Sequence, residues 1–151
     1  MKLSKLLVPS LALAAVFGIA ASHAVSAPQR ESKQKVVVHL SHFTDNLHAV
    51  KMAVHLAVKM QELGAEMTLL LDLEGVRLAD SRQPQELIWG KGEPISQEAA
   101  AFVKLGGQML LCPHCAAHCG ITATHLRPGA RIGKDGELAR TILAADKVLD
   151  Y

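Results

Sequence analysis

Three short apolar runs alternate with segments of helical character, and this alternation constrains the fold more than any other feature of the chain. The runs occupy residues 36–40, 67–71 and 108–111. Strands that are almost continuously apolar are typical of parallel sheets buried on both faces, and the helices that connect parallel strands supply the cover. The sequence therefore predicts an α/β fold: a three-layer α/β/α sandwich with a mainly parallel sheet of about five strands, flavodoxin-like in appearance.

The segments between the runs carry signals that begin and end helices. We expect Thr44 or Asp45 to cap a first helix that ends at Gly64. Ser96 is expected to cap a second helix. The other predicted elements are a short helix at 85–89, short strands at 130–133 and 148–150, and a helix at 137–145.

The N-terminus has the pattern of a secretory signal peptide. Lys2 and Lys5 form a basic region, residues 11–21 are apolar, and small residues precede a predicted cut after Ala24. A cut after Ala27 is the alternative. The apolar run is far shorter than the roughly 20 residues that a membrane span needs. We therefore expect a cleaved, periplasmic or secreted chain with no membrane span in its mature form.

The predicted domains are a signal peptide (1–24, or 1–27), a flexible lead-in (25–35) and one α/β domain (36–151). Removal of the signal peptide leaves 14 basic and 14 acidic residues. A chain with balanced charge and few aromatic residues is a poor match for nucleic acid or for an anionic membrane surface. We therefore expect no nucleic-acid partner.

All three cysteines lie within eight residues, directly after the third apolar run. They are Cys112, Cys115 and Cys119, and His114 and His118 lie between them. An odd number of cysteines in an oxidising compartment leaves at least one without an intrachain partner. A disulfide that closes so short a loop also removes little entropy from the unfolded chain. The cluster is therefore predicted to be functional rather than structural.

The local sequence singles out Cys112 as the nucleophile. Pro113 suits the first position of a helix, which makes Cys112 the N-cap and brings its sulfur near the free N–H groups of the first turn. Those donors and the helix dipole favour a thiolate. His42, in the loop after the first run, is expected to face Cys112, because both loops are expected to leave neighbouring parallel strands at the same edge. His39, within a predicted strand, is expected to be an ordinary sheet residue.

Several short segments carry a family resemblance: residues 64–68, 74–76, 106–113, 120–121 and 144–149. With them, the chain from Val36 to Tyr151 resembles the DsrE/DsrF-like (TusD-related) family of small sulfur-relay proteins. The most specific element of that family is a cysteine at the end of a strand, eight residues before a glycine, and Cys112 and Gly120 match it. The resemblance implies that Cys112 accepts sulfur, that Cys115 is a second cysteine found in many members, and that the chain forms homo-oligomers without a cofactor.

The leading hypothesis is an exported protein that carries or transfers sulfane sulfur as a persulfide on Cys112, with Cys115, Cys119 and His42 as further site residues. Its expected partners are sulfur donor and acceptor proteins or small sulfur compounds. Cys119 and His118 depart from the commoner residues of the family, and so does the signal peptide. A carrier of this kind need not turn over, so whether the chain is an enzyme stays open.

Two alternatives remain at the level of sequence. The first is binding of zinc or cuprous copper, for which thiolates and imidazoles are suitable ligands. The ligands in that case would be Cys112, Cys115 and Cys119 with His118, or with His114 or His42. The second alternative is general thiol–disulfide exchange through the Cys-x-x-Cys motif.

Overall fold

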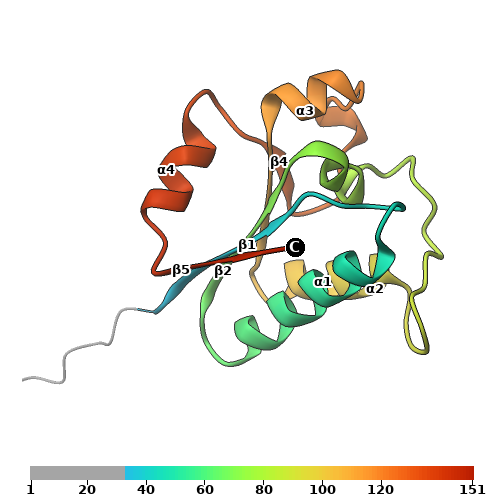
Figure 1. Ribbon diagram of the computed structural model, residues 1–151, viewed down its shortest axis with the longest axis horizontal. Coiled ribbons are helices and arrows are strands. Elements are labelled where there is room, and N and C mark those ends of the chain that lie inside the picture. Colours follow the sequence, from blue (N-terminus) through green and yellow to red (C-terminus); the bar gives the residue numbers. More distant parts are fainter. Residues whose placement is uncertain (1–32) are drawn as a thin grey trace, which may run out of the picture. The chain divides into compact units, whose positions relative to one another are not determined.

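The computed structural model describes residues 33–151 (Figure 1). The predicted signal peptide lies outside the described residues. The elements in chain order are β1 (Lys35–Leu40), α1 (Leu47–Glu62), β2 (Glu66–Leu71), the 3-10 helix η1 (Leu73–Ala79), α2 (Ile95–Lys104), β3 (Gln108–Leu111), α3 (Pro113–His118), the 3-10 helix η2 (Ala123–His125), β4 (Ala130–Ile132), α4 (Glu137–Leu143) and β5 (Lys147–Asp150). The five strands pair in parallel, so the predicted fold class is confirmed.

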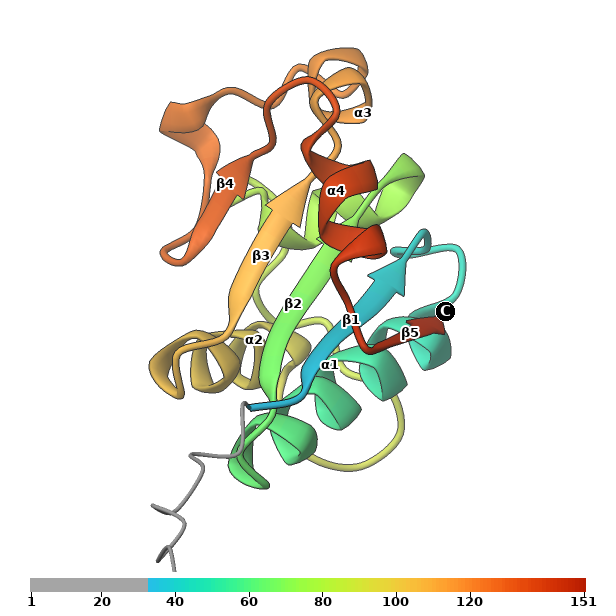
Figure 2. The ribbon, with the colours of Figure 1, turned by 90° about the vertical axis from the view of Figure 1, so that its left-hand side faces the viewer.

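The strand order β4-β3-β2-β1-β5 explains how the helices are distributed. The chain steps from β1 to β4 in one direction and then crosses back to add β5 at the opposite edge. Parallel crossovers are right-handed, so reversing the direction places the connecting helix on the other face of the sheet. Figure 2 shows this result, with α1 and α2 behind the sheet and α4 in front of it.

Both faces of the central strands are buried. Val38, Leu69 and Leu111 are fully buried on the side of the main core, which α1 and α2 complete. On the alternate positions, Leu70 and Leu110 are also buried. Burial on both sides is the reason that these strands read as unbroken apolar runs. Within residues 33–151, no helix combines the length and the apolar character needed to cross a membrane.

Both helix N-caps differ from their predictions. Asn46 caps α1, and its side-chain oxygen accepts a hydrogen bond from the Ala49 N–H at 3.1 Å. Asp45 is engaged one residue earlier, where its carboxylate accepts the Phe43 N–H at 2.8 Å. At α2 the N-cap is Pro94, and the Ser96 hydroxyl lies inside the helix, where it donates to the Gln85 carbonyl at 2.5 Å. Asp45 is thus engaged by a local backbone N–H and Ser96 by a carbonyl earlier in the chain, so neither residue caps its helix.

The helix predicted at residues 85–89 is wrong, because this segment has no regular structure. The Gln85 side-chain amide donates to two carbonyls of the same loop, those of Ser81 and Gln83, at 3.3 and 2.6 Å. Trp89 stacks on His48 of α1, with ring centroids 3.9 Å apart and planes 6° from parallel. Contacts with other elements therefore override the local helical tendency of this loop.

Candidate functional site

The cysteine cluster lies at the carboxyl edge of the sheet, where β3 ends. Cys112 is the N-cap of α3 and Pro113 occupies the first turn, as predicted. The Cys112 N–H donates to the Leu71 carbonyl at 2.8 Å, which ties the cluster to the end of β2. The Ala116 N–H donates to the Cys112 carbonyl at 2.9 Å and begins the helix. Backbone hydrogen bonds thus hold the position of Cys112, and all three cysteines are half-buried free thiols.

Cys112 and Cys115 are partners through their sulfur atoms. Burial, the hydrogen bond with Cys112, and the charges of Cys112 and Asp72 raise the pKa of Cys115 to about 11, although a backbone hydrogen bond from Leu73 opposes the rise. Cys115 is therefore a neutral thiol near neutral pH, and its S–H is a potential donor to Cys112. The expected hydrogen bonds from the first turn of α3 are absent, since the Cys112 side chain accepts none there.

Leu73 supplies a second contact to this pair. Its N–H donates to the Cys115 sulfur at 3.2 Å. Within residues 33–151 it is the one non-glycine residue with positive φ, at 42°. A leucine in this left-handed region costs of order 1 kcal/mol and persists only where its surroundings enforce it. The strain is concentrated at the residue that holds Cys115.

Gly75 shows what enforces the conformation of Leu73. A Cβ at position 75 would lie 2.1 Å from the Leu40 carbonyl oxygen, so only glycine fits there. The Gly75 N–H also donates to the Ser41 carbonyl at 3.3 Å. Because η1 is locked against the end of β1 in this way, Leu73 is held over the cluster.

An open cavity of about 470 Å³ lies beside the cluster, and we call it the cysteine hollow. It is lined by Leu73, Glu74, His114, Cys115, His118 and Cys119. Arg77 approaches from the side: a hydrogen bond with Glu74, and then the charge of Cys119, raise the pKa of the Arg77 guanidinium. The hollow thus combines two thiols, two imidazoles and a nearby cation. Cys112 is not part of its lining, but it is the partner of Cys115, which is.

His42 is not placed as the sequence suggested. The strand order puts β2 between β1 and β3, so the two loops do not leave neighbouring strands. His42 pairs instead with Asp45 of its own loop, Nδ1 to Oδ2 at 2.5 Å. The His42 side chain is not among those that line the cysteine hollow.

His39 is a residue whose environment the sequence did not reveal. Its Nε2 lies 2.9 Å from Asp72 Oδ1, and its Nδ1 lies 2.5 Å from Asp150 Oδ1. Burial by itself lowers the pKa of His39, but the hydrogen bonds and charges of the two carboxylates outweigh it and raise the pKa. The sequence signal that could have revealed this environment is a pair of acidic residues, one directly after β2 and one at the end of β5, because these two strands flank β1.

The described cysteines and histidines do not converge as a metal centre would. Within residues 33–151, no group of three or more histidine, cysteine, aspartate or glutamate side chains is arranged to hold a metal ion. Cys112 pairs with Cys115, while Cys119 and His118 lie farther along α3 at the hollow. The site is therefore organised around a pair of thiols.

Comparison with solved structures shows the same fold in other proteins. The YchN protein from E. coli matches with a TM-score of 0.65 and 25% identity, over 80% of this chain and 100% of that one. A protein of unknown function from Methanobacterium thermoautotrophicum matches with a TM-score of 0.58 and 11% identity, over 79% and 100% of the two chains. Another from Bacteroides thetaiotaomicron matches with a TM-score of 0.56 and 16% identity, over 78% and 95%.

No family model matches the sequence, and no curated protein does. The fold is thus the DsrE/DsrF-like fold of YchN, an all-parallel five-stranded sheet flanked by helices.

Proposed function

We propose that this protein handles sulfur in the periplasm and carries sulfane sulfur as a persulfide on Cys112. The observation that supports the proposal most is the Cys112–Cys115 pair at the end of β3, in which burial and Cys112 raise the pKa of Cys115 to about 11. A neutral thiol that donates a hydrogen bond stabilises negative charge on its partner. After sulfur transfer, the Cys115 thiol can therefore stabilise the persulfide anion on Cys112.

The loading step balances without an added oxidant. The Cys112 thiolate attacks the outer sulfur of thiosulfate, a new S–S bond forms, and sulfite leaves with the electron pair of the bond that breaks. A polysulfide donor reacts in the same way and leaves one sulfur shorter. In unloading, an acceptor thiolate attacks the outer sulfur of the persulfide and the Cys112 thiolate departs.

Cys115 offers a second exit for the sulfur. Its thiol can attack the inner sulfur of the Cys112 persulfide, forming a disulfide between the two cysteines and releasing hydrogen sulfide. The high pKa of Cys115 keeps this reaction slow near neutral pH, because only the thiolate is an effective nucleophile. The carrier therefore holds its sulfur until an acceptor arrives. Cys119, one turn farther along at the end of α3 and near Arg77, is the next thiol available to a relay.

The periplasmic location is part of the proposal and is supported by the N-terminal sequence, with its basic start, its apolar run at 11–21 and its small residues before Ala24. N-terminal sequencing of the exported protein should begin near Val25, or at Pro28 for the later cut. Recovery of the full-length chain from membranes would overturn this part of the proposal.

The test is the intact mass of the mature protein after treatment with thiosulfate or polysulfide and removal of excess donor. The wild-type chain and the Cys119→Ser variant should gain the mass of one sulfur atom, and Cys115→Ser should gain it with a changed lifetime. Cys112→Ser should gain none. Persulfide that survives in Cys112→Ser would reject the assignment.

Two further outcomes would favour the competing functions. Loss of two hydrogens with no gain of sulfur and no release of hydrogen sulfide would indicate thiol–disulfide exchange between Cys112 and Cys115, since resolution of a persulfide by Cys115 releases hydrogen sulfide. Stoichiometric zinc or copper in the purified protein, lost in each single cysteine variant, would indicate a metal site.

A further inference from the structure

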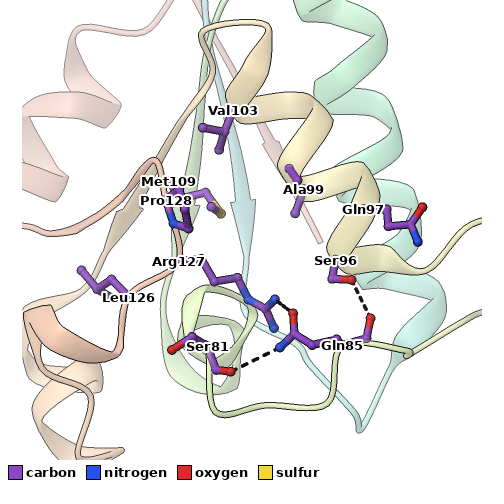
Figure 3. A pocket seen from close by; sticks show the side chains of 11 residues that line it. Ser81, Gln85, Ser96, Gln97, Ala99, Val103, Met109, Leu126, Arg127 and Pro128 are labelled. Atoms are coloured by element: carbon purple, nitrogen blue, oxygen red, sulfur yellow. Dashed lines mark hydrogen bonds between the residues drawn. The ribbon is translucent and has the colours of Figure 1, made fainter.

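A second cavity, of about 430 Å³, lies away from the cysteines between α2, the start of β3 and the segment that leads into β4 (Figure 3). We call it the Arg127 pocket. Its walls are mainly apolar, and its polar groups gather at one end. Its lining includes Ala100, Val103, Met109, Leu126, Arg127 and Gln85. The cavity contains no cysteine and no histidine, so it offers binding rather than sulfur chemistry.

Arg127 is the unusual member of this lining. One of its terminal nitrogens donates to the Gln85 side-chain oxygen, and Figure 3 shows the guanidinium reaching toward that residue. Its Nε is buried and has no hydrogen-bond partner in the described part of the chain. Within residues 33–151, no carboxylate forms an ion pair with Arg127. The cation is therefore half-buried and, among residues 33–151, without a counter-ion.

The nearest carboxylate does not supply the missing partner. Asp80 attracts Arg127 at a distance, but its oxygens already receive Arg82 through Nε at 2.9 Å and Nη2 at 2.8 Å. Burial lowers the pKa of the Arg127 guanidinium more than Asp80 raises it. An unpaired charge in an apolar setting is costly, and a ligand that brings the opposite charge offsets that cost.

Gln85 fixes where the cation points. Its amide nitrogen is held by the Ser81 and Gln83 carbonyls, which leaves its side-chain oxygen facing Arg127. A planar guanidinium held on one side presents its remaining donors in a fixed geometry that suits a carboxylate. Beside it, Val103, Met109 and Leu126 form an apolar wall.

The geometry points to a binding site for a small organic anion: a carboxylate that pairs with Arg127 and an apolar body that packs against Val103, Met109 and Leu126. The volume lies toward the lower end of the range for small-molecule sites, roughly 300–1,000 Å³. It therefore suits an acid of about the size of benzoate or hexanoate. An inorganic anion would use Arg127 but gain nothing from the apolar wall, so the site should prefer the organic acid.

The experiment measures binding of acetate, hexanoate and benzoate to the mature protein by calorimetry or NMR, with benzamide and inorganic sulfate as comparison ligands. Benzoate or hexanoate should bind at least tenfold more tightly than benzamide, because the amide lacks the charge that pairs with Arg127. Acetate and sulfate should also bind at least tenfold more weakly, because neither covers the apolar wall.

Three variants localise the site. Arg127→Gln should weaken benzoate binding at least tenfold, and Ala100→Phe should block the cavity while keeping the cation. Arg140→Gln is the matched control, since it removes the same charge from an exposed position on α4. Circular dichroism and thermal unfolding establish that each variant is folded before its binding is compared.

The proposal is overturned if none of the three acids binds at millimolar concentration, if benzamide or sulfate equals benzoate, or if Arg127→Gln binds as well as the wild type. If benzoate affinity falls as the protein concentration rises, and only the dimeric form fails to bind, a second copy of the chain fills the pocket. That result would also overturn the proposal. Persulfide formation on Cys112 should be unaffected in Arg127→Gln, which keeps this test separate from that of the sulfur-carrier proposal.

Discussion

The cysteine hollow and the Arg127 pocket are similar in size, about 470 and 430 Å³, yet they are built for different chemistry. The hollow lies beyond the strand ends, where loops and short helices deliver reactive side chains. The pocket lies against the face of the sheet, where α2 and β3 supply apolar walls and the segment that leads into β4 supplies one cation, Arg127. Reactivity thus resides at the edge of the sheet, and the capacity for shape-selective binding resides on its face.

A short structural unit around Asp80 connects the end of α3 with the segment that leads into β4. The Arg82 guanidinium grips the fully buried Asp80 carboxylate and also donates to the Gly120 carbonyl at the end of α3, at 3.2 Å. Asp80 pairs with Leu126 through an isolated bridge. The Ser81 N–H donates to the His125 carbonyl at 2.8 Å. A substitution that disrupts this unit should therefore affect both the end of α3 and the segment that leads into β4.

Asp80→Asn should have the largest effect on stability. It removes the charge of a buried carboxylate that pairs with the half-exposed Arg82, and it is expected to lower the free energy of unfolding by about 2–3 kcal/mol. Hydrogen bonds and the charge of Arg82 lower the pKa of Asp80 from 3.8 to about 2. The stabilisation is therefore complete above about pH 4 and is lost as the pH falls toward 2. Denaturant unfolding from pH 5 to pH 2 measures both effects.

Glu137→Gln is the matched control for that experiment. The pKa of Glu137 is also lowered to about 2, chiefly by a hydrogen bond with Arg131. The pair is more exposed than Asp80, so its loss should cost less. Equal losses in the two variants would contradict the idea that the buried Asp80 carboxylate contributes more to stability than an exposed ion pair.

The next effect concerns the reactivity of Cys115. Cys112→Ala removes a hydrogen bond and a charge that both raise the pKa of Cys115, so that pKa should fall. Alkylation of Cys115 at mildly alkaline pH should then become roughly five- to tenfold faster. Peptide mapping after timed labelling measures it, with Cys119 as the internal control. An unchanged rate at Cys115 would mean that the two sulfurs do not interact.

His39 should contribute a smaller, pH-dependent part of the stability. Its pKa is raised, so its interactions with Asp72 and Asp150 contribute fully below about pH 6.5 and are lost as the pH rises through the raised value. Asp150 is largely exposed, so we expect about 1 kcal/mol or less. His39→Asn should flatten the decline in unfolding free energy between about pH 6 and pH 9. The same slope in both proteins would contradict this role.

The smallest effect is expected for Arg127→Met. Removal of an unpaired, partly buried cation should leave the free energy of unfolding within about 0.5 kcal/mol of the wild type, or raise it. Arg82→Met is the contrasting variant, because it leaves the buried Asp80 carboxylate without its partner. If Arg127→Met destabilises the protein as much as Arg82→Met, Arg127 is a structural residue and the pocket loses its distinguishing feature.

Sequence patterns predicted the strands and the cysteine cluster because both are local. Continuous apolar runs located β1, β2 and β3, and Pro113 identified Cys112 as the N-cap of α3. The order of the strands is not local, and the assumption that β1 and β3 are neighbours misplaced His42. The partners of Cys115 were also hidden, since Leu73 reaches it from another strand end in a strained conformation that its own side chain does not predict.

The Arg127 pocket could not be predicted for a similar reason. The residues Arg127-Pro128-Gly129 are typical of a turn, and the structure has a turn there, but these residues alone do not indicate that the guanidinium is half-buried. Its enclosure depends on α2 and on the irregular segment around Gln85, for which a helix was expected. The environment of the Arg127 side chain therefore depends on segments that are distant in the sequence and that only the folded structure brings together.

The most direct test of the central claim is the intact mass of a chain in which Cys112 is the one remaining cysteine, made as Cys115→Ser/Cys119→Ser. After treatment with thiosulfate or polysulfide, this chain should gain one sulfur atom, and acid cleavage followed by peptide mapping should place it on Cys112. The same uptake is expected when Arg127→Gln is added, because the chemistry belongs to the cysteine hollow alone. No gain of sulfur in this chain, with a gain in the Cys112→Ser chain, would contradict the account.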